Sequence, residues 1–497
     1  MERDVTGAAA RRSKLPNEAK QKEAAKIRRE KTIGVGWSIL MLCVTYALIA
    51  AEYTVFLIKA GQAWQSVVGS LVLIAMGFGA FGVYAYIRRE KNLATFSRML
   101  LICVLLVIAC APLPVTMRVD VGFTVHVLAA MLVAVLTNRR LAMLSSVPVA
   151  AAAGVTAFVV SGVRGAPMGM ILAAAVTAIA AVLALGISST RSNTVIAAGL
   201  AGAAGAITYG AAMLACGEAF EAYWRTLLWI LGGSVLCGIL AVGFMPVFET
   251  LFDIPTDARL NELLNNNNPL LKRLMTEASG TYHHSLTVAA LAEAAAEQVG
   301  ANALLCRVAA TYHDVGKLKD PLCFKENQRT ENNVHNDLDP YESARRIIAH
   351  QQDSVELLEK HKFPGAVVRI AGEHHGDSVM VYFYDRAKKA APEGTEVDVS
   401  KFRYPSGKPS TKESAIIMLA DCCEAAVRSM KEPTMRDIAA KVREIINHKW
   451  DKRGSMLWDS PLSFAEINKI ETSFLRTFAA LYHERVEYPD LEEIDVR

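Results

Sequence analysis

The chain of 497 residues is 52% apolar and only 21% charged, which excludes a disordered protein and is high for an ordinary soluble enzyme. Its formal net charge of +4 is too small to indicate a general nucleic-acid-binding protein, because such a protein needs a concentrated basic face. The nine cysteines include no Cys-x-x-Cys pair, so a disulfide framework is not expected in a chain of this length.

The N-terminal half combines a polar tail with a long apolar region. Residues 1–31 contain ten Lys or Arg against five Asp or Glu, and we interpret them as a basic tail. Residues 32–247 are almost continuously apolar and predict a transmembrane bundle, since about 20 apolar residues cross a bilayer as a helix. About eight spans are expected, with the fourth the shortest, at residues 33–58, 66–87, 99–117, 121–136, 141–162, 167–187, 194–215 and 225–247.

Basic residues in the short loops indicate the orientation of these spans. The basic tail precedes the first span, four Lys or Arg lie between Arg88 and Arg98, and Arg139 and Arg140 follow the fourth span. Lys and Arg accumulate in cytoplasmic loops. We therefore predict that both termini are cytoplasmic and that the number of spans is even, with membrane lipid as the surrounding partner.

Small residues recur at helical spacing within the apolar region. Ala201 and Gly205, and likewise Ala206 and Gly210, form small-x-x-x-small pairs, which allow two helices to approach closely. The pattern favours packing within one bundle, and a homodimer interface is the alternative.

The C-terminal half has the pattern of a helical soluble domain. Residues 248–280 predict a helical linker, broken at Asn265–Pro269, between the membrane and a domain at 281–497. Helices are expected at 283–300, where Gly300 suits a C-cap, and at 303–313, 341–361 and 411–431. The fold class is therefore all-α: a polytopic membrane bundle followed by an α-helical domain.

Ten of the eleven histidines follow residue 282, and several accompany aspartates in short motifs. Five imidazoles and two carboxylates suit two first-row transition ions and do not suit Ca²⁺ or Mg²⁺, which prefer oxygen ligands. Asp314, beside His313, is the natural carboxylate to bridge two ions, and two ions can hold a phosphodiester for hydrolysis. The candidate ligands are His284, His313, Asp314, His350, His374, His375 and Asp421.

These residues resemble the HD phosphohydrolase superfamily, whose pattern is H…HD…D. The stretches GTYHHSLTVAALAEAAAE, YHDVGKLKDP, FKENQ, GEHHGDS, FRYPSGKPSTKESAIIMLAD and RVEYPD further resemble the membrane-anchored 7TM-HD family of bacterial cyclic-di-AMP phosphodiesterases. The resemblance implies a protein of the bacterial inner membrane whose cytoplasmic HD domain hydrolyses cyclic-di-AMP to linear pApA with two iron or manganese ions. The same seven residues are then the metal ligands, with Asp314 bridging.

Other residues near these motifs are candidates for catalysis or substrate binding. Lys317 of HD-x-G-K is a candidate to neutralise the phosphate, with a surface lysine as the alternative. Arg403, Tyr404 and Lys412 are candidates to hold base or phosphate, with a solvated loop as the alternative. Two other functions stay open: an HD hydrolase for another cyclic dinucleotide, and a nucleotide-binding receptor without turnover. The family commonly inserts a sensing domain after the first span, where this sequence has only a short loop.

Overall fold

The computed structural model describes residues 17–88, 96–186, 191–328, 333–450 and 455–481. Within these ranges the chain is built of α-helices and short 3₁₀ helices without a β-strand, and the all-α prediction is confirmed. The chain divides into two compact units, residues 1–258 and 259–497, and each is described by itself.

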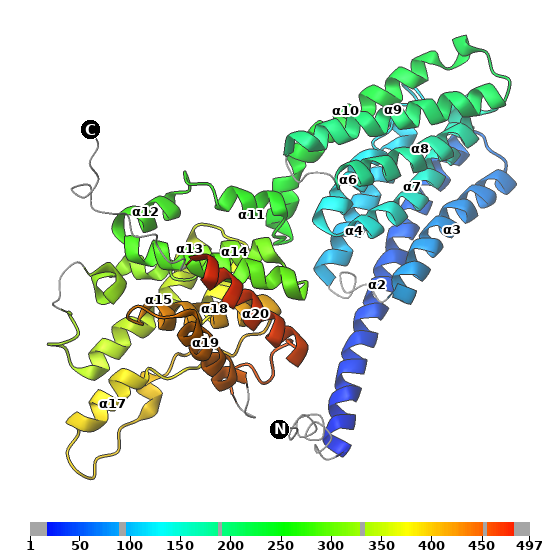
Figure 1. Ribbon diagram of the computed structural model, residues 1–497. Helices are drawn as coiled ribbons and strands as arrows, with labels where there is room; N and C mark the ends of the chain where they lie inside the picture. The colour runs from blue at the N-terminus through cyan, green and yellow to red at the C-terminus, as the bar shows by residue number, and fades with distance from the viewer. Residues whose placement is uncertain (1–16, 89–95, 187–190, 329–332, 451–454, 482–497) are drawn as a thin grey trace, which may run out of the picture. The chain divides into compact units, whose positions relative to one another are not determined.

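The first unit is a bundle of apolar helices (Figure 1). Seven of its helical segments are long and apolar enough to cross a membrane, since a spanning helix needs about 20 residues. In chain order the helices are α2 (Asn17–Lys59), α3 (Trp64–Arg88), α4 (Phe96–Cys110), α5 (Leu113–Thr116), α6 (His126–Leu136), α7 (Arg139–Val160), α8 (Ala166–Ala184), α9 (Arg191–Ala215) and α10 (Trp224–Leu251).

About eight spans are expected, and the described residues contain seven helices of spanning length, with the difference at the fourth expected span. Helix α6 has 11 residues, which at 1.5 Å per residue reach only about half of the ~30 Å hydrocarbon layer. Before it, residues 117–125 fold into turns. The Asp120 carboxylate accepts a hydrogen bond from the Gly122 amide at 2.8 Å, and the Asp120 carbonyl accepts one from Phe123. These local bonds replace the first turns of the expected helix.

The segment from Gly122 to Arg139 nevertheless runs from one end of the bundle to the other. Gly122 packs on Thr226 at the start of α10, so closely that a Cβ would lie 2.4 Å from the Thr226 carbonyl oxygen. Arg139 donates a hydrogen bond to the carbonyl of Gly186, just after α8. Helix α9 begins where α8 ends and leads to α10, so these two contacts lie at opposite ends. A turn segment and a short helix together make this crossing.

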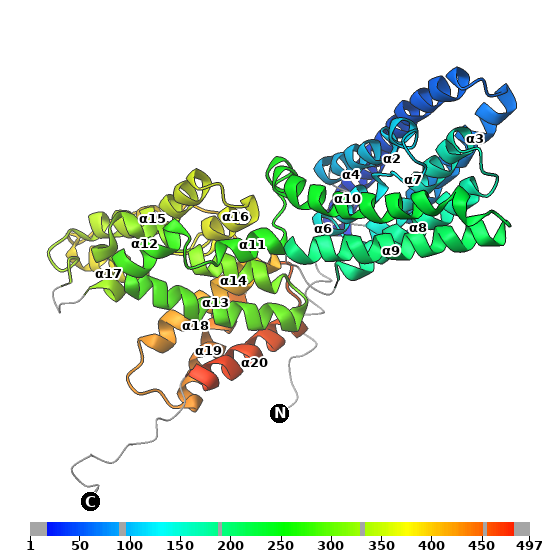
Figure 2. The same ribbon diagram turned by 90° about the horizontal axis from the view of Figure 1, so that it is seen from above.

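Small residues let the helices of this bundle approach one another. A Cβ on Gly205 of α9 would lie 1.9 Å from Thr177 Oγ1 of α8, and Gly210 faces Leu227 of α10. Helices α8, α9 and α10 lie side by side in both views (Figure 2). The small-x-x-x-small pairs therefore pack within one bundle, which is the favoured interpretation of that pattern.

The second unit is an assembly of shorter amphipathic helices. The predicted break at Asn265–Pro269 falls between its first two helices, and Leu260, Leu270 and Leu274 on either side are buried in its core. The helices are α11 (Asp257–Leu263), α12 (Pro269–Glu277), α13 (Ser279–Val299), α14 (Ala303–Tyr312), α15 (Pro340–Lys360), α16 (Gly365–Glu373), α17 (Val381–Ala390), α18 (Lys412–Arg428), α19 (Met435–Trp450) and α20 (Phe464–Leu481).

The core of the second unit fixes the helices that carry polar residues inward. Ala292 of α13, Ile416 of α18 and Phe474 of α20 are fully buried in one apolar cluster. Gly300 ends α13 in the left-handed conformation with φ of +64°, as expected for a glycine C-cap. Because α13 and α18 are held along their length, side chains on their other faces have defined positions.

Candidate metal centre

The seven predicted ligands come from five helices of the second unit, and the structure brings them together. His284 lies in the second turn of α13, His350 in the middle of α15 and Asp421 in the middle of α18. The other four follow the ends of helices, with His313 and Asp314 after α14 and His374 and His375 after α16. All are buried except His375, which is half-buried.

Asp314 lies between two groups of ligands. Its Oδ1 atom is 3.2 Å from His350 Nε2 and 3.6 Å from His374 Nε2, and its Oδ2 atom is 3.3 Å from His313 Nε2 and 3.7 Å from His284 Nε2. One carboxylate oxygen thus faces each group. This is the placement that a carboxylate bridging two ions requires.

Asp421 closes the site from α18. Its Oδ1 atom lies 3.1 Å from His284 Nε2 and 3.9 Å from His313 Nε2, and its Oδ2 atom lies 3.6 Å from His375 Nδ1. Two sets of atoms are close enough to hold an ion each: one from Asp314, His350, His374 and His375, and one from His284, His313 and Asp421.

Backbone carbonyls fix the orientation of three of these imidazoles. The Nδ1 atoms of His313, His350 and His374 lie within hydrogen-bond distance of the carbonyls of Ala310, Ile347 and Ala371, each three residues earlier. A carbonyl only accepts, so each Nδ1 carries the proton and each Nε2 turns toward the site. A neutral ring then presents its Nε2 lone pair to carboxylate oxygens, an arrangement that a cation stabilises.

Glu424 orients the fourth imidazole and was missed by sequence reasoning. Its buried carboxylate accepts a hydrogen bond from His284 Nδ1. Glu424 lies three residues after Asp421 on α18 and therefore on the same helix face. That spacing was the signal available in the sequence, and a carboxylate behind a histidine ligand is common at metal centres.

The charges of the site explain why protons compete with a metal. Burial opposes a charge on Asp314, but His313 and Lys317 outweigh it and hold its pKa well below the usual range. Burial likewise opposes a proton on His313, but Asp314 and Asp421 raise its pKa to about 10. Burial and the neighbouring His374 hold the pKa of His375 well below its usual value. Without metal, protons on some rings offset the carboxylates, so binding an ion releases protons.

Comparisons with known proteins agree with this geometry. Residues 64–256 match the family model described as 7TM receptor with intracellular HD hydrolase, and residues 281–426 match the model of the HD domain. Across these two stretches the chain is similar to 7TM-HD proteins.

Two curated relatives of this chain are cyclic-di-AMP phosphodiesterases named PgpH. The Bacillus subtilis protein is 46% identical over 252 residues, which are 51% of this chain and 35% of the relative. The Listeria monocytogenes protein is 44% identical over 254 residues, or 51% of this chain and 34% of the relative. The chain thus spans about a third of the length of these relatives. A crystal structure of the L. monocytogenes PgpH HD domain with cyclic-di-AMP is 41% identical, with a TM-score of 0.42, and is covered completely by 44% of this chain.

Lys317 is not a surface lysine, because its side chain is only 12% exposed. Its Nζ atom lies 2.8 Å from Asp314 Oδ2 and 2.7 Å from Glu326 Oε1, above the ring of Phe324. Glu326 and Phe324 belong to the FKENQ stretch. The ammonium group therefore contacts the central carboxylate of the site from the side of that stretch.

The three predicted substrate-binding residues have different surroundings. Tyr404 is buried and packs against His375 with ring centroids 4.4 Å apart and ring planes tilted by 40°, so it forms a wall of the centre. Arg403 is exposed and donates to the Asp377 carbonyl at 2.6 Å. Lys412 pairs with Glu466 at the first turn of α18, nine residues before Asp421 and thus about 13 Å along the helix. Tyr404 therefore contacts a predicted ligand, His375, whereas the partner of Lys412 is Glu466, which is not one of the seven ligands.

Two glycines allow backbone to pass close to the ligands. A Cβ on Gly316 would lie 2.1 Å from the carbonyl oxygen of His350 and 2.5 Å from the amide of Ser354. The His-Asp motif therefore packs directly on α15. Gly376 follows the histidine pair with φ of +57°, and its Cβ would lie 2.4 Å from Met456 Sδ.

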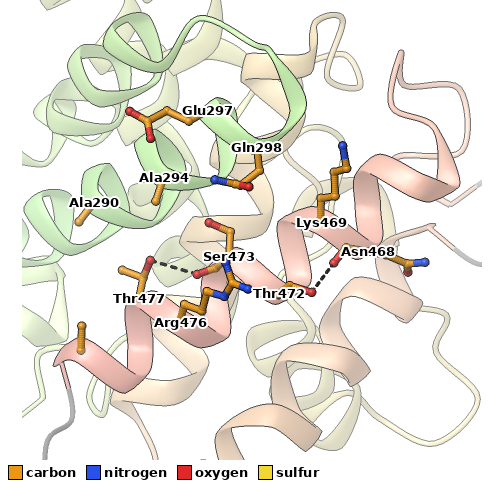
Figure 3. Close-up of a pocket in the computed structure, with 11 residues that line it drawn as sticks. Ala290, Ala294, Glu297, Gln298, Asn468, Lys469, Thr472, Ser473, Arg476 and Thr477 are labelled. Carbon is orange, nitrogen blue, oxygen red and sulfur yellow. Dashed lines mark hydrogen bonds between the residues drawn. The ribbon is translucent and has the colours of Figure 1, made fainter.

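A separate groove of about 640 Å³ lies between α13 and α20 (Figure 3). It is lined by small and polar residues such as Ala294 and Thr472 and includes none of the seven ligands. The Thr472 and Thr477 hydroxyls donate to carbonyls of their own helix, four residues earlier. These hydroxyls therefore have partners without a ligand.

Proposed function

We propose that this chain is an integral membrane, metal-dependent phosphodiesterase that hydrolyses cyclic-di-AMP to linear pApA. The observation that carries the proposal is the buried Asp314 carboxylate, whose two oxygens face two separate groups of histidines. The activity printed for both curated relatives, cyclic-di-AMP phosphodiesterase, supports the substrate. Water is the second reactant: it adds to phosphorus, and a ribose 3′ oxygen leaves with a proton.

We propose two iron or manganese ions as the cofactors. The donor set fits them, because imidazole and carboxylate ligands suit first-row transition ions. The two ions supply positive charge that polarises the phosphate and lowers the pKa of water. One ion is assigned to His350, His374 and His375, the other to His284, His313 and Asp421, and Asp314 is shared by both.

The remaining residues position these groups and the substrate. Lys317 holds Asp314 Oδ2 and keeps a positive charge beside the reacting phosphate. Tyr404 fixes the ring of His375 by packing against it and shields it from water. Arg403 lies in the adjoining loop, where an exposed guanidinium suits the second phosphate of a cyclic dinucleotide.

We also propose that the protein lies in the bacterial inner membrane with both termini in the cytoplasm. Seven spanning helices and the crossing at residues 122–139 make eight crossings, and an even number returns the chain to its starting side. The Lys and Arg of alternate loops favour the cytoplasm for that side. A homodimer is a further prediction, tested by the mass of the protein in detergent.

The test uses the full chain in detergent, loaded with Mn²⁺ and incubated with cyclic-di-AMP, cyclic-di-GMP or cyclic-GMP-AMP. We expect pApA from cyclic-di-AMP as the main product. Asp421→Ala should reduce turnover to background, because Asp421 contacts His284 and lies near His375. Asp385→Ala, which removes an exposed carboxylate paired with Lys389, is the matched control and should keep full activity.

The other candidate functions give different results in this experiment. Faster cleavage of another cyclic dinucleotide would assign that nucleotide as the substrate and would leave the assignment as a hydrolase unchanged. Tight binding of cyclic-di-AMP by metal-loaded protein without any product would favour the receptor. Full activity in Asp421→Ala would refute the assignment of the site.

A further inference from the structure

The short helix α6 begins deep inside the membrane bundle. The carbonyl of Thr124 accepts a weak hydrogen bond from the thiol of Cys237, and Cys237 is the fourteenth of the 28 residues of α10. A Cβ on Gly233, the tenth residue of α10, would lie 3.6 Å from the same carbonyl oxygen, so at 1.5 Å per residue this level is about 14 Å or more from the end of α10 at Trp224. Non-helical backbone is tolerated at such depth only where it is buried in protein or lines a cavity.

The open end of α6 carries a buried imidazole with one free nitrogen. No side chain caps the N-terminus of α6, and His126 is its first residue. His126 is 5% exposed, and its Nδ1 atom shares a hydrogen bond of 2.6 Å with Thr124 Oγ1. Helical side chains point back toward the N-terminus, so the ring lies at the open end. Its Nε2 atom is buried without a hydrogen-bond partner among the described residues.

An apolar groove of about 440 Å³ adjoins this break in the helix. Phe123 forms one side and stacks against Trp229 at 4.9 Å, while Gly232 and Gly233 of α10 leave the space open. A Cβ on Gly233 would be 3.6 Å from the Thr124 carbonyl oxygen, so this wall of the groove lies against the backbone of the residue that contacts His126. Leu228 and Leu236, which also line it, are largely exposed on the apolar surface of the bundle.

We propose that this break is a binding site for a membrane-dissolved carboxylic acid with a long hydrocarbon chain. The hydrocarbon chain lies in the groove along α10. The carboxyl group lies at the N-terminus of α6, where helix amides and the helix dipole favour negative charge, and it shares a proton with His126 Nε2. A carboxyl group matches the single imidazole, whereas a phosphate carries more charge and calls for Arg or Lys. The nearest basic residues along the chain, Arg118 and Arg139, contact Phe56 and Gly186 instead.

The experiment uses the full chain in phosphatidylcholine nanodiscs with a photoactivatable palmitic acid as the probe. After irradiation, mass spectrometry should locate saturable cross-links in residues 122–131 and 228–236. Palmitic acid should compete with the probe, whereas hexadecanol, which has the chain without the acid, should compete at least ~10-fold less well because the charge-assisted hydrogen bond is lost.

Two variants test the two halves of the site separately. His126→Phe removes the nitrogen, and Gly232→Leu fills the groove at a position where a Cβ meets no atom within 4 Å. Each should lower labelling about tenfold. Gly243→Leu is the matched control, because it lies on the same helix with equally free surroundings, and its labelling should equal that of the parent protein.

Melting temperatures of the variants separate loss of the site from loss of the fold, and Gly232→Leu keeps the test valid if His126→Phe unfolds. Even labelling over all apolar helices would overturn the proposal, and so would equal competition by hexadecanol. Labelling requires no hydrolysis, so this result is independent of the proposed phosphodiesterase.

Discussion

Several buried threonine hydroxyls of the membrane unit bond to their own helices, whereas buried imidazoles and carboxylates of the second unit face partners on other helices. Thr156 and Thr177 each donate to the carbonyl four residues earlier. In contrast, Asp314 contacts rings from α13 and α15, and Glu424 of α18 holds His284. Helices of the membrane unit whose hydroxyls bond within the same helix pack against one another through small residues. The helices of the second unit share a polar cluster. Two buried residues of the membrane unit depart from this contrast: Tyr53, whose hydroxyl lies 3.1 Å from Thr156 Oγ1 of another helix, and His126.

The contrast depends most on Asp314, because it serves both groups of ligands. We expect Asp314→Asn to lower the metal content of the purified protein from two ions to one or none and to reduce hydrolysis to background. An amide keeps the size of the side chain but loses the charge that two cations require. Elemental analysis and product formation measure the two effects, and Asp385→Asn serves as the control. Two ions bound to Asp314→Asn would refute the bridging role.

A substitution of Glu424 tests how much a residue that holds a metal ligand contributes to metal affinity. Glu424→Gln keeps the shape but weakens the hydrogen bond to His284 Nδ1. We expect metal affinity to fall by about 10–100-fold, as is usual when a residue behind a metal ligand is changed. Competition with a chelator measures this affinity without relying on activity. Glu444→Gln, an exposed carboxylate paired with Lys441, should leave it unchanged, and an equal effect of both variants would contradict the role of Glu424.

Close helix contacts occur in both units but differ in what lies opposite the glycine. We expect Gly316→Ala to destabilise the second unit by about 1–3 kcal/mol, the usual cost of overpacking, because the added methyl meets the backbone of α15. Gly205→Ala in the membrane meets the Thr177 side chain, which has more freedom to adjust, and should cost less. Thermal unfolding measures both, with Gly407→Ala as the control in open space. A larger effect at Gly205 would reverse the comparison.

Periodicity and residue type were enough to predict the helices and the candidate ligands. Helical runs, Gly300 and the His-Asp motifs are local signals, and each predicted helix of the second unit is present within a few residues. The helix of the fourth span is shorter than the predicted 121–136, because the Asp120 carboxylate just before it stabilises a turn at Gly122, and hydropathy does not reveal such a local hydrogen bond. The close packing of Gly316 on α15 could not be predicted, because α15 is distant in sequence. The partners of Lys317 and Lys412 are likewise set by tertiary contacts that spacing does not reveal.

The smallest expected effect concerns Lys412, predicted to bind substrate but paired with Glu466 in the structure. Lys412 and the Ser463 amide lower the pKa of Glu466 to about 2. A lowered pKa stabilises the fold above the pKa of the unfolded chain, and the gain is lost as the pH falls through the folded value. Lys412→Met should therefore lower the melting temperature slightly at pH 7, by the equivalent of at most about 1 kcal/mol for so exposed a pair. This difference should close between pH 4.5 and about 2.

If the ion pair is the role of Lys412, the KM for cyclic-di-AMP stays within about twofold of the parent value, since the contact removed involves no substrate. A large rise in KM with unchanged stability would return Lys412 to the binding site.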